Sequence, residues 1–209
     1  MIARSTPRSL GVLISGRGSN LQSIIDAIAE RRLEANIAVV VSNRADALGL
    51  QRARDAAIDA VHLSPSHYAD RDAYDRALAE LLVARGAAWV CLAGFMRLVG
   101  RPLLEAFPNR ILNVHPSLLP AFPGLDAQRQ ALEHGVRVTG ATVHIVNAEL
   151  DAGPIVLQAA VPVLEGDTVE TLASRVLVEE HRLYPEAIGM LLDGGWAIAG
   201  RRLVRTAAS

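Results

Sequence analysis

The sequence predicts an α/β fold with a Rossmann-like mixed sheet, mostly parallel with an antiparallel C-terminal part, and with helices on both faces. In the first half, short apolar runs alternate with amphipathic stretches, which is typical of parallel strands covered by helices. In the second half, two longer apolar runs are joined by a turn-prone segment, which indicates antiparallel pairing. No linker, repeat or low-complexity tract divides the 209 residues, so we expect residues 1–209 to form a single domain.

The first half is expected to alternate strands and helices. The apolar run SLGVLISG (9–16) predicts a strand that ends in glycine. From Asn20 onward, apolar residues at 21, 24, 25 and 28 follow the spacing of one helix face. Further apolar runs predict strands at 37–43, 60–64, 88–94 and 110–115, and helical patterns lie between them at 46–57, 71–86 and 101–107.

The second half contains the segments expected to pair antiparallel. Residues 140–148 and 154–163 are apolar and partly alternating, and the segment ELDAGP between them favours a turn. Residues 168–192 predict a long helix with a kink at Pro185, and residues 195–204 predict a small terminal hairpin.

Charge and hydropathy limit the class of function. The chain has 21 basic and 22 acidic residues and a pI near 6.6, whereas nucleic-acid-binding domains typically have a pI above about 9, so we expect no nucleic-acid partner. The N-terminus is interpreted as a short tail that enters the first strand, not as a signal peptide, and no apolar run approaches the roughly 18 residues of a membrane span. Cys91 is the single cysteine and is expected to be a small core residue. We therefore expect a cytoplasmic protein, monomeric or homodimeric, that acts on small molecules.

The first strand is followed by the turn SGRGSNL, residues 15–21. Its glycines allow a tight turn, and Ser19 and Asn20 stand where a helix N-cap belongs. Free N–H groups and the helix dipole at such a position favour a phosphate. The motif is not the dinucleotide pattern G-x-G-x-x-G, because Leu21 occupies the third glycine position. From this motif alone, a phosphate site and a capped turn without a ligand both remain open.

The run LNVHP, residues 112–116, ends a predicted strand with two polar side chains. Asn113 and His115 are two residues apart and therefore point to the same face, and Pro116 stops the strand. Ligands in open α/β sheets bind at the carboxyl ends of strands. An amide N–H and an imidazole N–H aimed at one point would form an oxyanion hole. A hydrogen-bonded strand end with a satisfied core histidine is the alternative interpretation.

Asp151 lies in the turn ELDAGPI, where a carboxylate is most often a turn former. If that turn lies beside His115, Asp151 could orient the imidazole or take a proton from a nucleophile. Asn113, His115 and Asp151, without an evident serine or cysteine nucleophile, suggest direct transfer of a small acyl group between two bound substrates.

The sequence resembles the phosphoribosylglycinamide formyltransferases, which are folate-dependent enzymes of purine synthesis. The similarity covers nearly all of residues 10–185. HPSLLP with a downstream D-x-G-P-I is typical of the wider formyltransferase superfamily, and SGRGSNL and AFPGL narrow the resemblance to the enzymes acting on glycinamide ribonucleotide. The matching stretches are VLISGRGSNLQSIIDA, VVVSNRADALGLQRA, DRDAYDRAL, LAGFMRLV, RILNVHPSLLPAFPGL, RQALEHGV, GATVHIVNAELDAGPIVLQAAVPV and EEHRLYP.

The resemblance implies a role for each group of site residues. The catalytic trio would be Asn113, His115 and Asp151. The ribonucleotide would be bound by Gly18, Ser19, Asn20 and Glu180, and the folate by Arg71, Met96, Arg97, Leu98 and Val99 together with Asn113. Residues 1–108 would then bind mainly the ribonucleotide phosphate, and residues 109–209 would carry the trio and the folate cleft. Core positions for Met96 and Leu98, and solvated helix charges for Arg71 and Glu180, are the alternatives.

The family resemblance further implies that 10-formyltetrahydrofolate is a co-substrate and that no metal is required. The chain departs from many bacterial relatives at Asp126 and Gln128, where those proteins have histidines, so we expect a supporting imidazole to be missing there. His144 is expected to be structural or to support the trio, and no His, Cys and carboxylate residues have metal-ligand spacing.

Three other functions remain as rivals. A formyltetrahydrofolate hydrolase would share the trio but use water as acceptor, and such proteins usually carry an extra N-terminal domain. A methionyl-tRNA formyltransferase would be expected to have an added C-terminal domain and a basic surplus. A non-catalytic nucleotide-binding module would make the trio a structural coincidence.

Overall fold

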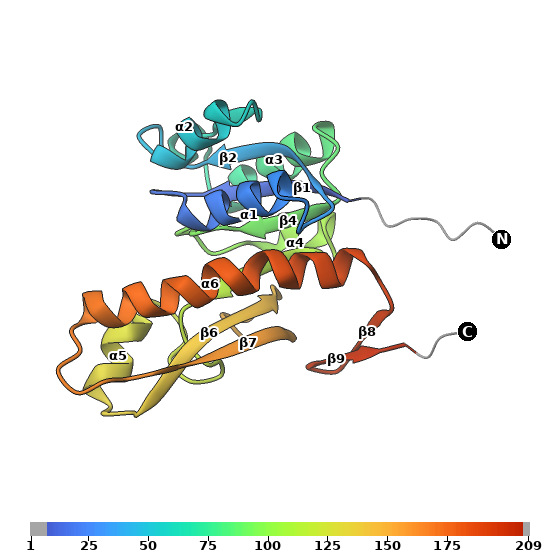
Figure 1. The fold of residues 1–209 in the computed structure, drawn as a ribbon. Coiled ribbons are helices and arrows are strands. Elements are labelled where there is room, and N and C mark those ends of the chain that lie inside the picture. The colour runs from blue at the N-terminus through green and yellow to red at the C-terminus, as the bar shows by residue number, and fades with distance from the viewer. Residues whose placement is uncertain (1–7, 207–209) are drawn as a thin grey trace.

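The computed structural model describes residues 8–206, and the expected N-terminal tail at 1–7 lies outside them. The strands of this part form one sheet in the order β3-β2-β1-β4-β5-β6-β7-β9-β8 (Figure 1). Their bounds are β1 Ser9–Ile14, β2 Asn36–Ser42, β3 Ala60–His62, β4 Trp89–Leu92, β5 Ile111–His115, β6 Val138–Ile145, β7 Ile155–Pro162, β8 Trp196–Ala199 and β9 Arg202–Arg205. The helices are α1 Ser19–Ala29, α2 Leu48–Asp55, α3 Arg71–Ala84, α4 Arg101–Ala106, α5 Ala127–Glu133 and α6 Val169–Leu192.

The pairing of the strands confirms the predicted mixed sheet. The five strands β3, β2, β1, β4 and β5 are parallel to one another. The direction reverses at β6, which pairs antiparallel with both β5 and β7. The terminal hairpin of β8 and β9 is also present, as predicted from residues 195–204.

Two apolar cores cover the two faces of the sheet, which confirms helices on both sides. On one face, Leu21 and Ile24 of α1 pack with Leu183 and Ile188 of α6 against the sheet. On the other face, α3 and α4 pack over β1, β2 and β4 in a separate core that includes Leu78. Continuous apolar strands such as VVV in β2 are buried on both sides for this reason.

Helix α6 connects the two halves of the sheet. It begins after Thr168, whose side chain caps Thr171 N–H, and continues through Pro185 as one helix. Figure 1 shows α6 running between α1 and the β6–β7 pair. The buried Tyr184 hydroxyl lies 3.0 Å from the carbonyl oxygens of both Leu92 and Leu112, so α6 also contacts β4 and β5.

Two short elements were not predicted from the sequence. One is α5, residues 127–133, and the other is a 3₁₀ turn at Pro65–His67. Each is a single-turn or two-turn element, too short to give a clear hydrophobic period.

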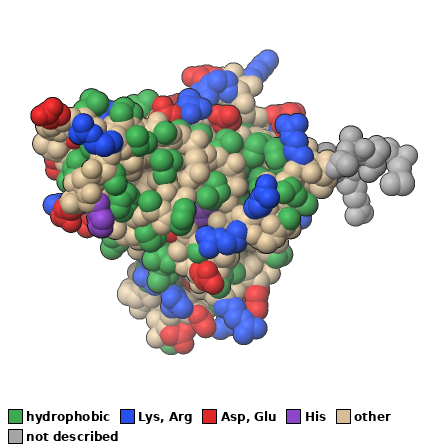
Figure 2. Space-filling view, turned by 90° about the horizontal axis from the view of Figure 1, so that it is seen from below, with side chains coloured by type: hydrophobic (Ala, Val, Ile, Leu, Met, Phe, Trp, Pro, Cys, Tyr) green, Lys and Arg blue, Asp and Glu red, His purple; other side chains and the backbone are tan. Residues whose placement is uncertain are grey.

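The surface carries charges of both signs. On the face shown in Figure 2, acidic and basic side chains are interspersed with apolar ones, as expected for a chain with a formal net charge of −1. Within residues 8–206, no helix combines the length and apolar character needed to cross a membrane.

Candidate active site

Three predicted site segments leave the sheet from strands that are neighbours in it. The turn with Gly18 follows β1, the segment 94–100 follows β4, and Asn113 and His115 lie at the end of β5. Because these strands are parallel, their carboxyl ends lie at the same edge of the sheet. The fold therefore gathers residues that are far apart in the sequence at one edge.

His115 is buried and has a partner for each ring nitrogen. Its Nε2 lies 2.9 Å from the carbonyl oxygen of Phe122, and its Nδ1 lies 3.5 Å from Asp151 Oδ2. Asn113 Nδ2 lies 3.2 Å from His144 Nε2. Asn113 and His115 share a face of β5, as predicted, and each has a hydrogen-bond partner within the protein, as is usual for buried polar groups.

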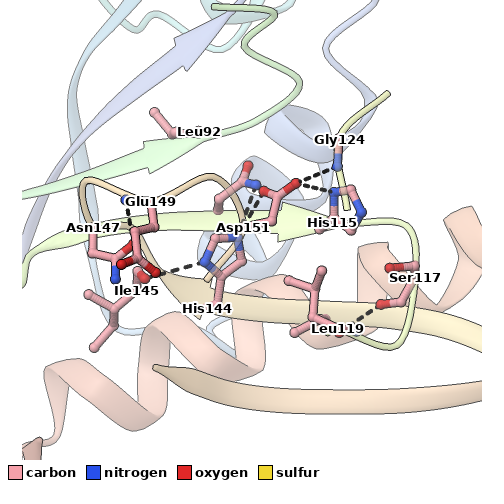
Figure 3. Close-up of polar contacts among 12 residues, drawn as sticks. Leu92, His115, Ser117, Leu119, Gly124, His144, Ile145, Asn147, Glu149 and Asp151 are labelled. Atoms are coloured by element: carbon pink, nitrogen blue, oxygen red, sulfur yellow. Dashed lines mark hydrogen bonds and ion pairs between the residues drawn. The ribbon is translucent and has the colours of Figure 1, made fainter. Parts of the chain in front are cut away.

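Asp151 lies between two histidines (Figure 3). Its Oδ2 accepts a 2.8 Å hydrogen bond from Gly124 N–H and faces His115, and its Oδ1 lies 3.6 Å from His144 Nε2. The side chain is 9% exposed. Its backbone adopts φ 49°, a left-handed conformation that the turn between β6 and β7 requires. The turn thus lies beside His115, which was the condition for a role beyond turn formation.

The surroundings of Asp151 keep it ionised. Burial acts to raise the pKa of the carboxyl, but hydrogen bonds from His144 and Gly124 and the charge of His115 outweigh it, so the pKa lies below its usual value. A carboxylate in this position can accept hydrogen bonds from the N–H groups of both neighbouring imidazoles.

His144 completes the cluster, as a residue that supports the trio. It is 2% exposed and stands directly opposite Asn113 in the β5–β6 pair. Its Nδ1 lies 3.3 Å from the carbonyl oxygen of Ile145. The register of β6 against β7 shifts between Val143 and His144, a bulge of the kind that re-aims side chains beside active sites.

The loop after Pro116 supplies backbone groups to the site. Thr142 Oγ1 donates to Ser117 O and accepts from Leu119 N–H, which ties the loop to β6. Gln130 of α5 donates to the carbonyl oxygens at 123 and 125. This loop brings Phe122 O to His115 and Gly124 N–H to Asp151, two contacts that residue types alone did not predict.

The turn after β1 differs from its prediction in one respect. Gly18, with φ 71° and ψ 32°, is the N-cap of α1, and no side chain caps the helix. The prediction that Ser19 and Asn20 act as capping residues is therefore wrong, because a glycine at the left-handed position already turns the chain. Both belong to the first helical turn, whose backbone N–H groups have no partner within the helix.

Asn20 and Glu180 meet although they are 160 residues apart. Asn20 Nδ2 donates a 2.8 Å hydrogen bond to Glu180 Oε2, and both side chains are buried. The Oδ1 atom of Asn20 has no partner among the described residues. An open pocket of about 360 Å³ adjoins the turn, with Ser19 and His181 in its wall. The structure thus brings together two residues that the family resemblance assigned to one substrate.

Glu180 is an unusual carboxyl because it is buried and forms no ion pair with any of residues 8–206. Burial raises its pKa to about 7, and the hydrogen bond from Asn20 offsets this only in part. Glu180 is therefore not a solvated helix charge, which was the alternative interpretation.

Replacing Glu180 with glutamine is expected to flatten the pH dependence of stability. In the folded state this carboxyl holds its proton up to pH about 7, against about 4.5 for an ordinary glutamate. Its contribution to stability is thus fully present below pH 4.5 and is lost as the pH rises through 7, by about 3 kcal/mol. The free energy of unfolding, measured in urea from pH 5 to pH 8, should fall less in Glu180→Gln. The exposed Glu186 on the same helix provides a control, and equal slopes for Glu180→Gln and Glu186→Gln would contradict the prediction.

The segment 94–100 exposes two apolar side chains, those of Met96 and Leu98, to solvent. Met96 and Leu98 are 69% and 58% exposed, so the alternative of core positions is wrong for both. Arg97 lies over the Tyr74 ring, 5.0 Å from its centroid. Val99 packs against the core, and Arg71, at the first position of α3, is exposed. Leu125 and Leu150, which adjoin Gly124 and Asp151 in sequence, are also exposed apolar residues.

The two positions that depart from the family pattern are Asp126 and Gln128. Asp126 adopts φ 55° as the N-cap of α5 and forms no side-chain cap. No ion pair or hydrogen bond links its side chain or that of Gln128 to the trio among the described residues. Within residues 8–206, no group of three His, Cys, Asp or Glu residues is arranged as metal ligands would be.

The sequence is similar to that of proteins of known family. Residues 9–188 match the profile described as formyl transferase. The phosphoribosylglycinamide formyltransferase of Escherichia coli K12 is 47% identical over 183 residues, which cover 88% of this chain and 86% of that protein. The trifunctional purine biosynthetic protein adenosine-3 of Bos taurus is 46% identical over 185 residues, 88% of this chain, but the chain spans only 18% of that longer protein.

The fold is similar to that of solved structures. The crystal structure of glycinamide ribonucleotide transformylase 1 from Symbiobacterium toebii matches with a TM-score of 0.95 and 61% identity, covering 99% of this chain and 97% of that one. That of phosphoribosylglycinamide formyltransferase from Brucella melitensis matches with a TM-score of 0.85 and 43% identity, covering 92% of this chain and 99% of that one.

Proposed function

The chain belongs to the formyl transferase family, and from that premise we propose that it transfers a formyl group from 10-formyltetrahydrofolate to the amine of 5′-phosphoribosylglycinamide. The products are formylglycinamide ribonucleotide and tetrahydrofolate, in a step of de novo purine biosynthesis. The match to the formyl transferase profile confirms, at the level of the family, the resemblance inferred from sequence motifs. The enzyme acts on small-molecule substrates, and we expect it to do so in the cytoplasm.

One observation carries the proposal most strongly. The ionised Asp151 lies between His115 and His144, and Asn113 contacts His144, at the sheet edge where the turn after β1 and the segment after β4 also end. A polar cluster between two binding segments is suited to a reaction between two bound substrates.

The reaction proceeds without a covalent enzyme intermediate. The glycinamide nitrogen attacks the formyl carbon, a C–N bond forms, and the formyl oxygen becomes an alkoxide. Asn113 and protonated His115 stabilise that charge by exchanging their contacts with His144 and Phe122 O for the alkoxide. The bond from carbon to N10 of the folate then breaks.

Asp151 supports two parts of this sequence. Its carboxylate faces Nδ1 of His115 and orients the ring toward the alkoxide. The amine proton passes to N10 of the departing folate by one of two routes. Either Asp151 itself carries the proton, or a water molecule bound to its carboxylate does. The pKa of Asp151 is lowered, which supports a carboxylate that acts through its negative charge. It also supports a transfer in which the proton is bound to Asp151 only transiently.

The two substrates are held by different segments. The phosphate of the ribonucleotide binds the free N–H groups of Gly18, Ser19 and Asn20, and Glu180 contacts the same substrate. The folate binds along Met96, Arg97, Leu98 and Val99, with Arg71 and Asn113. In this assignment residues 1–108 contribute the phosphate site, and residues 109–209 contribute the trio and the rest of the folate cleft.

A single assay separates the proposal from its rivals. The protein is mixed with 10-formyltetrahydrofolate, and tetrahydrofolate release is followed with and without glycinamide ribonucleotide. We expect release to depend on the ribonucleotide, because water is not the acceptor. Equal release without it would identify a hydrolase, and no release in either case would favour a methionyl-tRNA formyltransferase or a binding module.

A further inference from the structure

The segment 94–100, after β4, is held by two side chains from other parts of the fold. Ser15 Oγ, at the end of β1, accepts a 2.8 Å hydrogen bond from Met96 N–H and donates to Asn43. Asp75 Oδ2, from α3, accepts a 2.5 Å hydrogen bond from Gly100 N–H. Ser15 and Asp75 are both buried. The segment is therefore fixed near its start and at its end.

The buried carboxyl of Asp75 lowers the stability of the folded protein. It lies on the face of α3 that also buries Tyr74, Leu78 and Leu82. Burial raises the pKa of the carboxyl, and the hydrogen bond from Gly100 together with the nearby Arg71 and Arg97 offsets this only in part. A buried carboxylate costs stability that an apolar side chain would not. Packing alone therefore does not explain an aspartate at position 75.

The contact with Gly100 is unusually close. A Cβ atom at Gly100 would lie 2.5 Å from Asp75 Oδ2, a separation that real Cβ atoms essentially never show, and 3.4 Å from Asp72 Oδ1. Gly100 has φ −92°, so the constraint on this position comes from space and not from a left-handed backbone. The close approach of the backbone to Asp75 thus depends on both residues.

Helix α3 also contacts the predicted folate residues directly. Arg97 stacks on Tyr74, the residue before Asp75, and Arg71 is one turn earlier on the helix. Asp75 therefore lies at the junction of Arg71, Arg97 and the end of the segment.

We propose that Asp75 is a positioning residue for the formyl donor, because its carboxylate takes Gly100 N–H and so fixes the backbone of Arg97, Leu98 and Val99 for the folate. This inference rests on the proposed role of segment 94–100. Asp75 touches no reacting atom, and it acts through the segment alone. It should influence binding of the formyl donor and not binding of the ribonucleotide.

The test compares Asp75→Ala, Asp75→Asn and Asp72→Ala. Binding of 10-formyltetrahydrofolate is measured by calorimetry without ribonucleotide, and KM for both substrates and kcat are measured separately. We expect Asp75→Ala to weaken donor binding and raise the donor KM by about tenfold, the loss of one charge-assisted hydrogen bond. The ribonucleotide KM should stay within about twofold, and Asp75→Asn, which keeps an acceptor oxygen, should recover most of the donor affinity. Asp72→Ala removes a neighbouring exposed carboxylate and should behave as wild type.

Several results would overturn the inference. They are an unchanged donor affinity in folded Asp75→Ala, an equal rise of both KM values, or the same effect in Asp72→Ala. If Asp75→Ala does not fold, Gly100→Ala disturbs the same contact from the other side, and its donor affinity decides in the same way. Because donor binding is measured without turnover, a wild-type protein that binds the donor but does not transfer formyl would refute the proposed function and leave the role of Asp75 testable.

Discussion

Replacing His115 with alanine is expected to lower kcat by about 10²–10³ or more, and Asn113→Ala by a similar factor, while KM for both substrates changes far less. Loss of one donor to a developing oxyanion typically has this effect, because the interaction is made in the transition state and not with the bound substrates. Steady-state kinetics on each variant, after confirmation that it is folded, measures the change. His62→Ala removes an exposed histidine at the end of β3 and should leave kcat as in wild type.

The opposite outcome for His115 would be informative. Near-normal kcat in a folded His115→Ala variant would remove the end of β5 from the chemistry. The hydrogen bond from His115 Nε2 to Phe122 O would then be only a means of satisfying a buried histidine at a strand end.

The double variant His115→Ala, Asp151→Ala is expected to be little slower than the worse of its two parents. His115 Nδ1 and Asp151 Oδ2 face each other at 3.5 Å, and groups that act as a unit are not additive when removed. Asp151→Ala alone should lower kcat by about 10²–10³, because it removes the carboxylate that orients the His115 ring and takes part in the transfer of the amine proton. The measurement is kcat for both singles and the double.

Two comparisons sharpen this second experiment. Glu149→Gln removes a carboxylate from the same turn, where Glu149 is exposed, and should have little effect on kcat. A double variant whose loss equals the product of the two single losses would show that His115 and Asp151 act independently.

The parts of the fold that were predicted correctly depend on local patterns. The alternation of apolar strands and helices predicted the parallel half of the sheet, and the partly alternating runs on either side of Asp151 predicted the antiparallel pair. The polar pair Asn113 and His115 was visible because both residues interrupt an apolar run two positions apart, before a proline.

The remaining features depend on tertiary contacts that residue types do not encode separately. The pairing of Asn113 with His144 follows from the antiparallel register of β6 on β5. Phe122 O and Gly124 N–H are backbone groups of an irregular loop, and any residue type has them. The contact from Asn20 to Glu180 depends on how α6 packs on α1. The family resemblance placed Asn20 and Glu180 in one binding site, whereas their residue types and spacing did not predict that they meet.

The N-cap of α1 shows a different limit. Serine and asparagine at 19 and 20 are good capping residues by type, but Gly18 already occupies the left-handed position before the helix. The backbone conformation at a single glycine therefore decided the role of its two neighbours.

The most direct test of the proposed reaction follows the formyl carbon through a single turnover. Enzyme in excess over 10-formyltetrahydrofolate, labelled in the formyl group, is mixed with glycinamide ribonucleotide and quenched on the millisecond scale. The amount of label is then measured separately in the donor, the ribonucleotide, formate and the precipitated protein. We expect it to pass from the donor to the ribonucleotide amine with none on the protein, at a rate about 10²–10³ lower in His115→Ala. Label recovered on the protein, or as formate in proportion to the donor consumed, would contradict direct transfer.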